Sequence, residues 1–361
     1  MTRPRTQRRP VTQRLAGLGV AAVLAAAAAL SGCTTAREAE AKANAGATAT
    51  CPVTGNPEVK GAVRIGYQAI PNANLIVRDR RWLEACLPNA TITWIKFDSG
   101  ADVVQGFGSG SVDLATLGSS PATKALSAPL NVDMRVVWID DVIGKAESLV
   151  VKDTSITTIA GLKGKTITTP FSSTSHYSLL QALADAGLNP GTDVKLVNLS
   201  PDKMLGAWQG DQVDAAWVWD PVLSELAQHG KIITGSDVTA EKGHPTFDLE
   251  GATGAFVTAN PGFMETWTAV QNHAVQELAA NPRAAAQSIA VQLGSTPEAV
   301  TGQLSGYLFP DARKQLELTA ALPKQLSATA EFLKSQGDVD AVSPLKTYAD
   351  GVYTDAIKKV A

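Results

Sequence analysis

The sequence predicts an α/β protein of two similar lobes, and two observations carry this prediction. A helix end, a Gly turn, a strand that opens with Val-Asp, and a Pro that starts the next helix occur in this order twice, at 107–121 and at 208–221. From about residue 58, short apolar runs alternate with helical stretches, which is typical of a sheet with parallel strands. Each repeat offers a strand end and a helix start, where open α/β sheets bind ligands.

Residues 1–32 predict a removable signal peptide. Five Arg and no acidic residue precede an apolar run, which ends in Leu-Ser-Gly-Cys33. This ending resembles a bacterial lipobox, in which Cys33 becomes the lipidated first residue; an ordinary signal peptide cut elsewhere is the alternative. We therefore expect an exported protein with a tether over 33–57, held at the outer face of the cytoplasmic membrane or in the periplasm.

Charge and cysteine content narrow the function classes. Without the five Arg of residues 1–32, 26 Lys and Arg stand against 34 Asp and Glu, a formal charge of −8. This charge disfavours nucleic acid as a partner. With Cys33 lipidated, Cys51 and Cys86 remain as a pair in an oxidising compartment, where a disulfide is expected and two buried thiols are the alternative. No His, Cys or carboxylate set has metal-ligand spacing, so neither a metal nor another cofactor is expected.

The expected elements follow from these periodicities in chain order. Short apolar runs predict strands at 62–67, 90–97, 112–117, 134–139, 148–152, 166–169, 194–198, 214–219, 231–234 and 255–258. Helical stretches between them predict helices at 75–86, 102–107, 120–127, 174–186, 201–209 and 221–228. After residue 261 the pattern is wholly helical, with helices expected at 261–281, 282–292, 296–304, 311–336 and 344–360.

The folded part is too long for one ordinary core, so two lobes are expected. Lobe 1 is predicted from 58–152 together with 253–361, and lobe 2 from 153–252. The chain then crosses between the lobes twice, near 151–155 and near 249–258. Two crossings form a hinge that closes over a ligand.

Four segments resemble a known family. They are Val-Arg-Ile-Gly-Tyr-Gln-Ala-Ile-Pro-Asn at 63–72, Leu-Gly-Ser-Ser-Pro at 117–121, Pro-Phe-Ser-Ser-Thr-Ser-His-Tyr-Ser-Leu-Leu at 170–180, and 208–221. They resemble the taurine-binding proteins of ABC importers, part of a wider group that binds sulfonates, nitrate and pyrimidine precursors.

The resemblance runs over about residues 60–275. It implies a type II periplasmic-binding-protein fold, a ligand clamped between the lobes, and a permease and an ATPase as partners. We expect a monomer. The lipobox and the Cys51/Cys86 pair depart from the soluble periplasmic members, which bears on anchoring and not on the ligand.

Taurine carries a sulfonate at one end and an ammonium at the other, so its site needs hydrogen-bond donors opposite a carboxylate or aromatic group. Ser119 and Ser120 stand at a helix start, where free N–H groups and the helix dipole favour an anion. Ser173 and Thr174 repeat this arrangement in the second lobe. Plain helix capping is the alternative for these hydroxyls.

Candidates for the cation pole follow the strand at 214–219. Alternation predicts that Trp217 and Trp219 share one face. Asp220 suits an ammonium beside these rings, but it also suits a helix cap, and both interpretations stay open. Glu147 is a second candidate carboxylate, whose alternative is a solvated loop charge.

Three further residues are candidates. Tyr67 and Gln68 end the first strand and are expected on the cleft wall of lobe 1, although Tyr67 also suits a half-buried aromatic at the rim. His176 lies just inside a helix start and belongs to the segment at 170–180 that resembles taurine-binding proteins, but a lone His is more often structural.

The leading hypothesis is a binding protein that captures taurine or a similar small sulfonate without chemistry. A betaine-like zwitterion, nitrate or a pyrimidine precursor is the alternative ligand, and a sensory binding module is the alternative role. An exported hydrolase or transferase is disfavoured, because none of the common hydrolase, metalloprotease or phosphate-loop motifs occurs.

Overall fold

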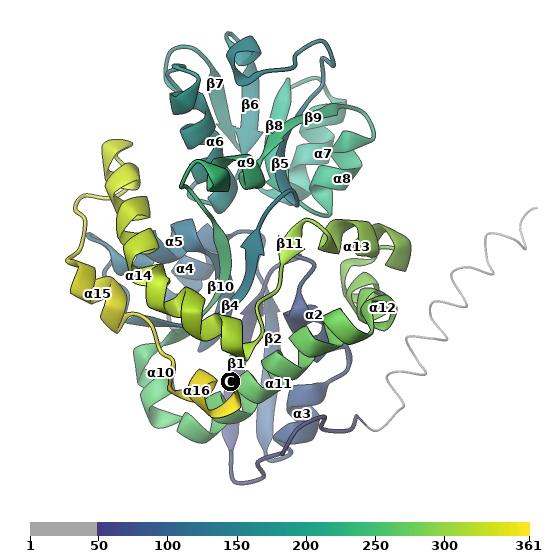
Figure 1. Ribbon diagram of the computed structural model, residues 1–361, viewed down its shortest axis with the longest axis vertical. Helices are drawn as coiled ribbons and strands as arrows, with labels where there is room; N and C mark the ends of the chain where they lie inside the picture. The colour runs from purple at the N-terminus through teal and green to yellow at the C-terminus, as the bar shows by residue number, and fades with distance from the viewer. Residues whose placement is uncertain (1–48) are drawn as a thin grey trace, which may run out of the picture. The chain divides into compact units, whose positions relative to one another are not determined.

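The computed structural model describes residues 49–361, which form two β-sheets surrounded by helices (Figure 1). The first sheet contains β1 (Gly61–Tyr67), β2 (Ala90–Lys96), β3 (Leu114–Gly118), β4 (Met134–Ile143), β10 (Phe247–Thr253) and β11 (Tyr307–Leu308), in the order β11-β4-β10-β3-β1-β2. The second contains β5 (Glu147–Val151), β6 (Thr166–Thr169), β7 (Lys195–Asn198), β8 (Ala215–Trp219) and β9 (Lys231–Gly235), in the order β7-β6-β8-β5-β9. The predicted two-lobed α/β fold is confirmed; we call the parts built on the first and second sheets lobe 1 and lobe 2.

Both sheets are mixed rather than purely parallel, which corrects one expectation. β1 runs parallel to β2 and β3, and β6 runs parallel to β7 and β8. β10 is antiparallel to β3 and β4, and β5 is antiparallel to β8 and β9. β5 and β10 are the strands that enter each lobe from the other one, and each runs against its neighbours.

The crossings lie upstream of the predicted positions. β5 pairs with β8 from Glu147 opposite Trp219 to Val151 opposite Ala215, so it belongs to the second sheet. β10 pairs from Phe247 onward with lobe 1 strands. The chain therefore crosses between β4 and β5 and again between β9 and β10, not near residues 151–155 and 249–258.

The strand expected at 255–258 is wrong, because α10 (Gly254–Ala259) occupies this segment. Thr253 caps this helix, with its side chain accepting a hydrogen bond from the Phe256 N–H. The strand nearest to the expected one is β10. Its sequence is not uniformly apolar, because it contains Asp248 and Glu250, both of which are buried.

The helices of the βα units are α2 (Ala73–Asp79), α3 (Trp82–Cys86), α4 (Gly100–Gly108), α5 (Ser119–Leu126), α6 (Thr174–Asp185), α7 (Pro201–Gln209), α8 (Val222–Ala227) and α9 (Ser236–Glu241), with a 3₁₀ turn at Ile159–Leu162. The single helix expected at 75–86 is two helices, because Arg81 adopts a left-handed conformation at φ 52° that interrupts the helix. α9 was not expected from the sequence.

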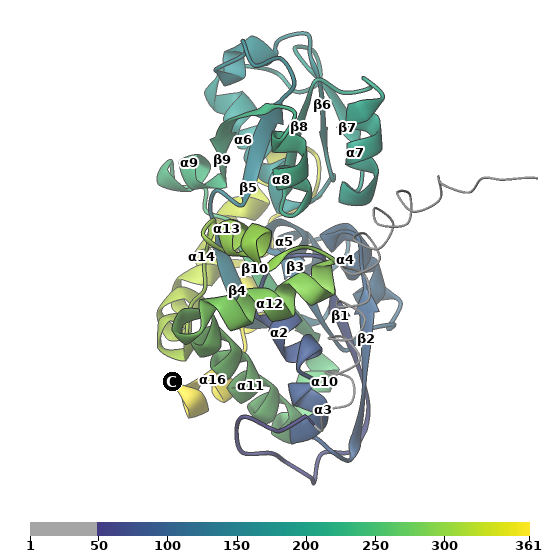
Figure 2. The ribbon, with the colours of Figure 1, turned by 90° about the vertical axis from the view of Figure 1, so that its right-hand side faces the viewer.

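The C-terminal part is helical, as predicted, and completes lobe 1. It contains α11 (Pro261–Ala280), α12 (Pro282–Leu293), α13 (Pro297–Leu304), α14 (Ala312–Ser335), α15 (Leu345–Asp350) and α16 (Asp355–Val360), of which the last two replace one expected helix. α11 and α12 pack on α2 (Figure 2), and Phe263 and Trp267 join Trp138 in one core on this side of the sheet. Leu322 and Leu326 of α14 join a second core on the first sheet.

The start of the described chain is fixed to lobe 1. Cys51 and Cys86 form a disulfide with a Cα–Cα distance of 4.7 Å, which confirms the predicted bridge. The Asn56 N–H donates to the Cys86 carbonyl at 2.8 Å, so this part of the expected tether belongs to the folded body. The predicted signal peptide and Cys33 lie outside the described residues. Over 49–361, no helix combines the length and apolarity that a membrane crossing requires.

Candidate functional site

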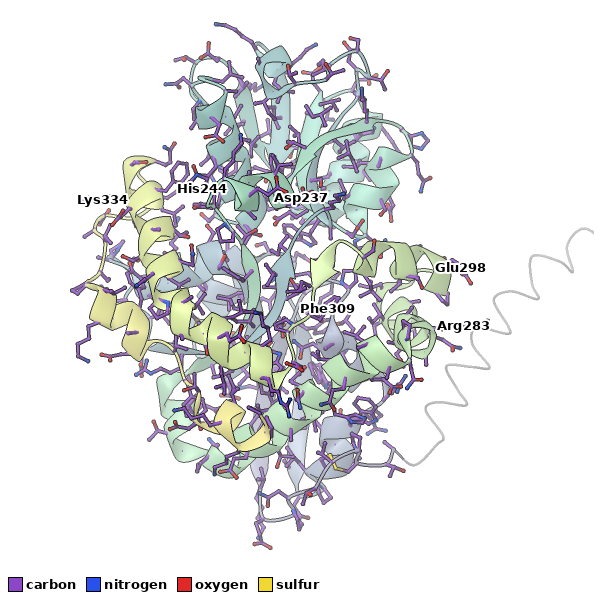
Figure 3. All side chains as sticks on the ribbon, viewed as in Figure 1. Asp237, His244, Arg283, Glu298, Phe309 and Lys334 are labelled. Carbon is purple, nitrogen blue, oxygen red and sulfur yellow. A yellow bond between two sulfur atoms is a disulfide. The ribbon has the colours of Figure 1, made fainter. Side chains whose placement is uncertain are left out.

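A small cavity lies between the lobes, where strands of both sheets end. It is lined by Gln68, Ile70, Gly100, Gly118, Pro121 and Asp248 of lobe 1 and by Ser173, Thr174 and Trp219 of lobe 2. Its volume is only about 10 Å³, because side chains of both lobes fill the space between the ribbons (Figure 3). A ligand of several heavy atoms therefore requires the lobes to separate before it enters.

The close approach of the lobes depends on Gly118, which ends β3. A Cβ atom at this position would lie 2.7 Å from Thr174 Cγ2, on the first turn of the opposite lobe's α6. This distance is shorter than side chains tolerate, so only glycine allows this contact. The strand-to-helix turn of the first repeat, at Gly118, thus faces the start of α6, and the second repeat contributes Trp219 to the cavity.

The two serines at the start of α5 are buried, and the Ser119 hydroxyl contacts a strand of lobe 1. Ser119 is buried, and its Oγ accepts a hydrogen bond from the Phe247 N–H of β10 at 3.2 Å. Ser120 is also buried, at 1% exposure. Neither residue lines the cavity, although Gly118 before them and Pro121 after them do.

The hydroxyls at the start of α6 serve two purposes. Ser173 is the N-cap: its Oγ accepts from the His176 N–H at 3.1 Å and donates to the Pro170 carbonyl at 2.6 Å. Thr174 Oγ1 donates to a Glu147 carboxylate oxygen at 2.8 Å. Capping is therefore confirmed for Ser173, and both residues also line the cavity.

Glu147 is buried at 1% exposure, so the alternative of a solvated loop charge is wrong. Its carboxylate accepts hydrogen bonds from the hydroxyls of Thr174, Ser175 and, at 3.5 Å, Ser236. Burial raises the pKa of Glu147 to about 8, against the opposing effect of the Ser175 hydrogen bond. This carboxylate is held at the first crossing by three hydroxyls of lobe 2.

Further buried carboxyls surround this crossing, and sequence reasoning missed them. With Glu147 they form what we call the acidic group: Asp140 and Asp141 of β4, Glu147 of β5, and Asp248 and Glu250 of β10, each at most 5% exposed. Over residues 49–361, none of the five forms an ion pair with Lys, Arg or His.

Asp248 is the member of the acidic group that lines the cavity. Burial, and then the nearby Asp140 carboxylate, raise the pKa of Asp248 to about 7. Deeper in lobe 1, Asn74 Nδ2 donates to Glu250 at 3.0 Å and to Thr116 Oγ1 at 2.9 Å, and Thr116 donates to Glu250 at 2.9 Å. A cationic group in the cavity would therefore meet Asp248 first, with further buried carboxyl groups behind it.

The contacts of Asp220 and of the two Trp residues differ from those expected for the predicted cation pole. Asp220 Oδ1 accepts hydrogen bonds from the N–H, at 3.0 Å, and the hydroxyl of Ser224, so it caps α8. Burial raises its pKa, and it does not line the cavity. Trp217 packs in the core with Leu149, whereas Trp219 packs with Val218. Trp219, which pairs with Glu147 at the end of the β5–β8 ladder, lines the cavity, and Trp217 does not.

Of the two residues predicted on the cleft wall of lobe 1, one lines the cavity and the other does not. Gln68 lines the cavity, and its Nε2 donates to the Thr116 carbonyl at 3.0 Å. Tyr67 is half-buried and lies outside the cavity, in contact with the Trp94 ring. The Arg78 guanidinium lies over its ring, 4.2 Å from the ring centre. This position agrees with the alternative interpretation of Tyr67 as a half-buried aromatic residue.

His176 lies in the first turn of α6. It stacks on Phe171 with ring centres 4.6 Å apart, and burial lowers its pKa. It is not among the cavity residues. Over residues 49–361, no three His, Cys, Asp or Glu side chains are arranged to hold a metal ion.

Comparison with known proteins agrees with this architecture. A model of the NMT1-like family matches residues 56–293. The taurine-binding periplasmic protein of Escherichia coli (strain K12) is 38% identical over 262 residues, which cover 70% of this chain and 80% of that protein. The solved alkanesulfonate-binding protein SsuA of Xanthomonas axonopodis pv. citri, bound to MOPS, matches with a TM-score of 0.69 at 25% identity, over 83% of this chain and 99% of that one.

Two lobes joined by two crossings, with a cavity between them, define a type II periplasmic-binding-protein fold. The chain belongs to the NMT1-like family and, within it, is related to the taurine-binding periplasmic protein. The same fold also carries enzymes: the desulfurization enzyme DszB matches with a TM-score of 0.62 at 17% identity, over 83% of this chain and 99% of that one, which is a likeness of fold alone.

Proposed function

We propose that this protein is the extracytoplasmic substrate-binding component of an ABC importer and that it captures taurine or a similar small amino sulfonate. The observation that carries the proposal is the pairing, in one interlobe cavity, of Asp248 with the hydroxyl-bearing start of α6. The relationship to taurine- and sulfonate-binding proteins supports this choice of ligand class. A permease and an ATPase would be the partners.

In this proposal the sulfonate lies toward the starts of α5 and α6, where N–H groups and the helix dipoles favour an anion. Ser173, Thr174 and Gln68 add polar side chains on this wall. The ammonium lies toward Asp248, with Trp219 as the adjacent aromatic surface. A buried carboxylate that lacks a cationic partner is stabilised by a ligand that brings one.

Capture would require no chemistry. Both cysteines of residues 49–361 are in the disulfide, and His176 lies outside the cavity. Binding would proceed by separation of the lobes, entry of the ligand and closure. Lipidation at Cys33, in the segment outside the described residues, would keep the protein near the permease.

Calorimetric titration of the purified full-length protein tests the proposal. Taurine, ethanesulfonate, glycine betaine, nitrate and orotate are titrated under the same conditions. We expect one site per chain, tight binding of taurine and weaker binding of ethanesulfonate, which lacks the ammonium. A response to nitrate or orotate without any response to a sulfonate would overturn the assignment.

A further inference from the structure

The C-terminal end of α14 reaches from lobe 1 to lobe 2 (Figure 1). Leu322 and Leu326 of this helix lie in a lobe 1 core. Leu333, two residues before the helix ends, packs instead with Tyr177 of α6, and Phe332 meets the same ring edge-on with centres 5.3 Å apart. The helix is therefore anchored in one lobe and contacts the other, away from the two strand crossings.

Polar contacts continue this bridge just after the helix. The Asp338 carboxylate lies 3.8 Å from Lys124 Nζ of α5 and 4.0 Å from His176 Nδ1 of α6. The side chains of Lys124 and Asp338 are 31% and 24% exposed, so water screens this pair only in part. Lys124 Nζ also donates to Ser172 Oγ, across the lobes, at 3.0 Å.

The contacted loop positions the cavity wall. Ser172 has a left-handed backbone at φ 61°, which is unfavourable for a residue with a side chain, and its N–H donates to His176 Nδ1 at 3.3 Å. The next residue, Ser173, caps α6 and lines the cavity. The contacts that hold Ser172 in this conformation therefore also fix the position of the first turn of α6.

We propose that Lys124 and Asp338, both of lobe 1, form a latch that contacts Ser172 and His176 of lobe 2, holds these two residues in place and favours the closed form. Lys124 and Asp338 are positioning residues: neither lines the cavity, and they act through the first turn of α6. Contacts that exist only when the lobes meet shift the equilibrium toward closure, and they thereby raise the apparent affinity for a ligand bound between the lobes. The proposal rests on the proposed function only for the effect on ligand affinity.

The test compares Lys124→Ala and Asp338→Asn in the full-length protein. In the ligand-free protein, we expect both single variants to speed hydrogen–deuterium exchange of amides 171–177, with exchange in β1 unchanged. With taurine, we expect each to raise the Kd about two- to five-fold, the scale of a partly exposed ion pair, through faster dissociation rather than slower association.

Two matched controls are Lys334→Ala and Asp340→Asn. Both residues are exposed, flank the latch and form no ion pair within residues 49–361; Lys334 is labelled in Figure 3. Unchanged exchange at 171–177 in both latch variants, or changes equal to those of the controls, would overturn the latch. Because exchange is measured without ligand, that result differs from the absence of sulfonate binding by the wild-type protein, which would overturn the proposed function instead.

Discussion

Thr174 and Glu147 join two elements of lobe 2 at the site: the hydroxyl of Thr174, in the first turn of α6, donates to the Glu147 carboxylate at 2.8 Å, where the chain first enters lobe 2. The same threonine approaches Gly118 of lobe 1 with its methyl group. One side chain thus connects the first crossing, the start of α6 and the contact between the lobes. The predictions below separate these roles.

Asp248 is expected to determine the preference for an ammonium-bearing ligand. Asp248→Asn keeps the shape of the side chain and removes its charge. A hydrogen bond to a charged group contributes about 1.5–3 kcal/mol, so taurine should bind about ten-fold or more weakly, whereas ethanesulfonate should change little. Titration of both ligands against the variant and the wild type measures this difference. Equal weakening of both ligands would assign Asp248 to general support of the cavity.

Gly118→Ala is expected to block closure without unfolding lobe 1. Gly118 has φ −67°, which alanine adopts readily, but its Cβ would lie 2.7 Å from Thr174 Cγ2. We expect taurine affinity to fall about ten-fold or more, with little change in the ligand-free Tm. Thr174→Ser removes this methyl group and keeps the hydroxyl for Glu147, so the double variant should regain affinity. A double variant as weak as Gly118→Ala would contradict the steric explanation.

The lobes, the repeated turns and most helices were predictable because apolar periodicity and helix starts are local signals. Asp248 was not predictable, because an acidic residue inside a strand has the pattern of a surface position. Only the pairing of β10 with β3 and β4 shows that it is buried.

The role of Asp220 stayed open for a related reason. A cap and a ligand contact require the same residue at the same helix start, so the sequence alone does not separate them. Trp217 and Trp219 join different core clusters, and only Trp219 lines the cavity, which their identical residue type and spacing did not distinguish. The location of the candidate site, at the helix starts, was therefore predictable, but its complete set of residues was not.

Asp220→Ala tests the capping role. Loss of the hydrogen bonds to Ser224 should reduce the free energy of unfolding by about 0.5–2 kcal/mol. Taurine and ethanesulfonate should keep the same affinity ratio as in the wild type, because Asp220 lies outside the cavity. Chemical denaturation and titration measure the two effects. A selective loss of taurine binding would contradict this prediction and would indicate that Asp220 contacts the ammonium group of the ligand.

The ligand-free protein is expected to lose stability as pH rises from about 4.5 to 8. Glu147 has an ordinary pKa of 4.5, and burial raises it to about 8 in the folded protein. Between these values the folded state binds more protons than the unfolded state, so the free energy of unfolding decreases with pH. Asp140 and Asp248, with pKa values raised by burial to about 7, act in the same direction up to that pH.

Glu147→Gln should flatten this dependence, by at most about 1.4 kcal/mol per pH unit, the value for one proton. Denaturation curves at pH 5, 6, 7 and 8 measure the slope, with the exposed Glu241→Gln as the matched control. A part of the slope should remain, since Asp140 and Asp248 still titrate. If Glu147→Gln has the slope of the wild type, the Glu147 carboxyl is not protonated in the folded protein.

The Cys51–Cys86 disulfide is expected to stabilise lobe 1 without affecting the ligand. The bridge joins residues 35 apart in sequence, and Cys86 is fully buried at the end of α3. In the chain-entropy model, a loop of this size contributes about 3–4 kcal/mol by restricting the unfolded chain. Cys51→Ser should therefore lower the Tm clearly, and reduction of the wild-type protein should have the same effect. Taurine affinity should stay within about two-fold of the wild type at a temperature where both proteins are folded, because neither cysteine lines the cavity. An unchanged Tm, or free thiols at both positions in protein from an oxidising compartment, would contradict the structural role.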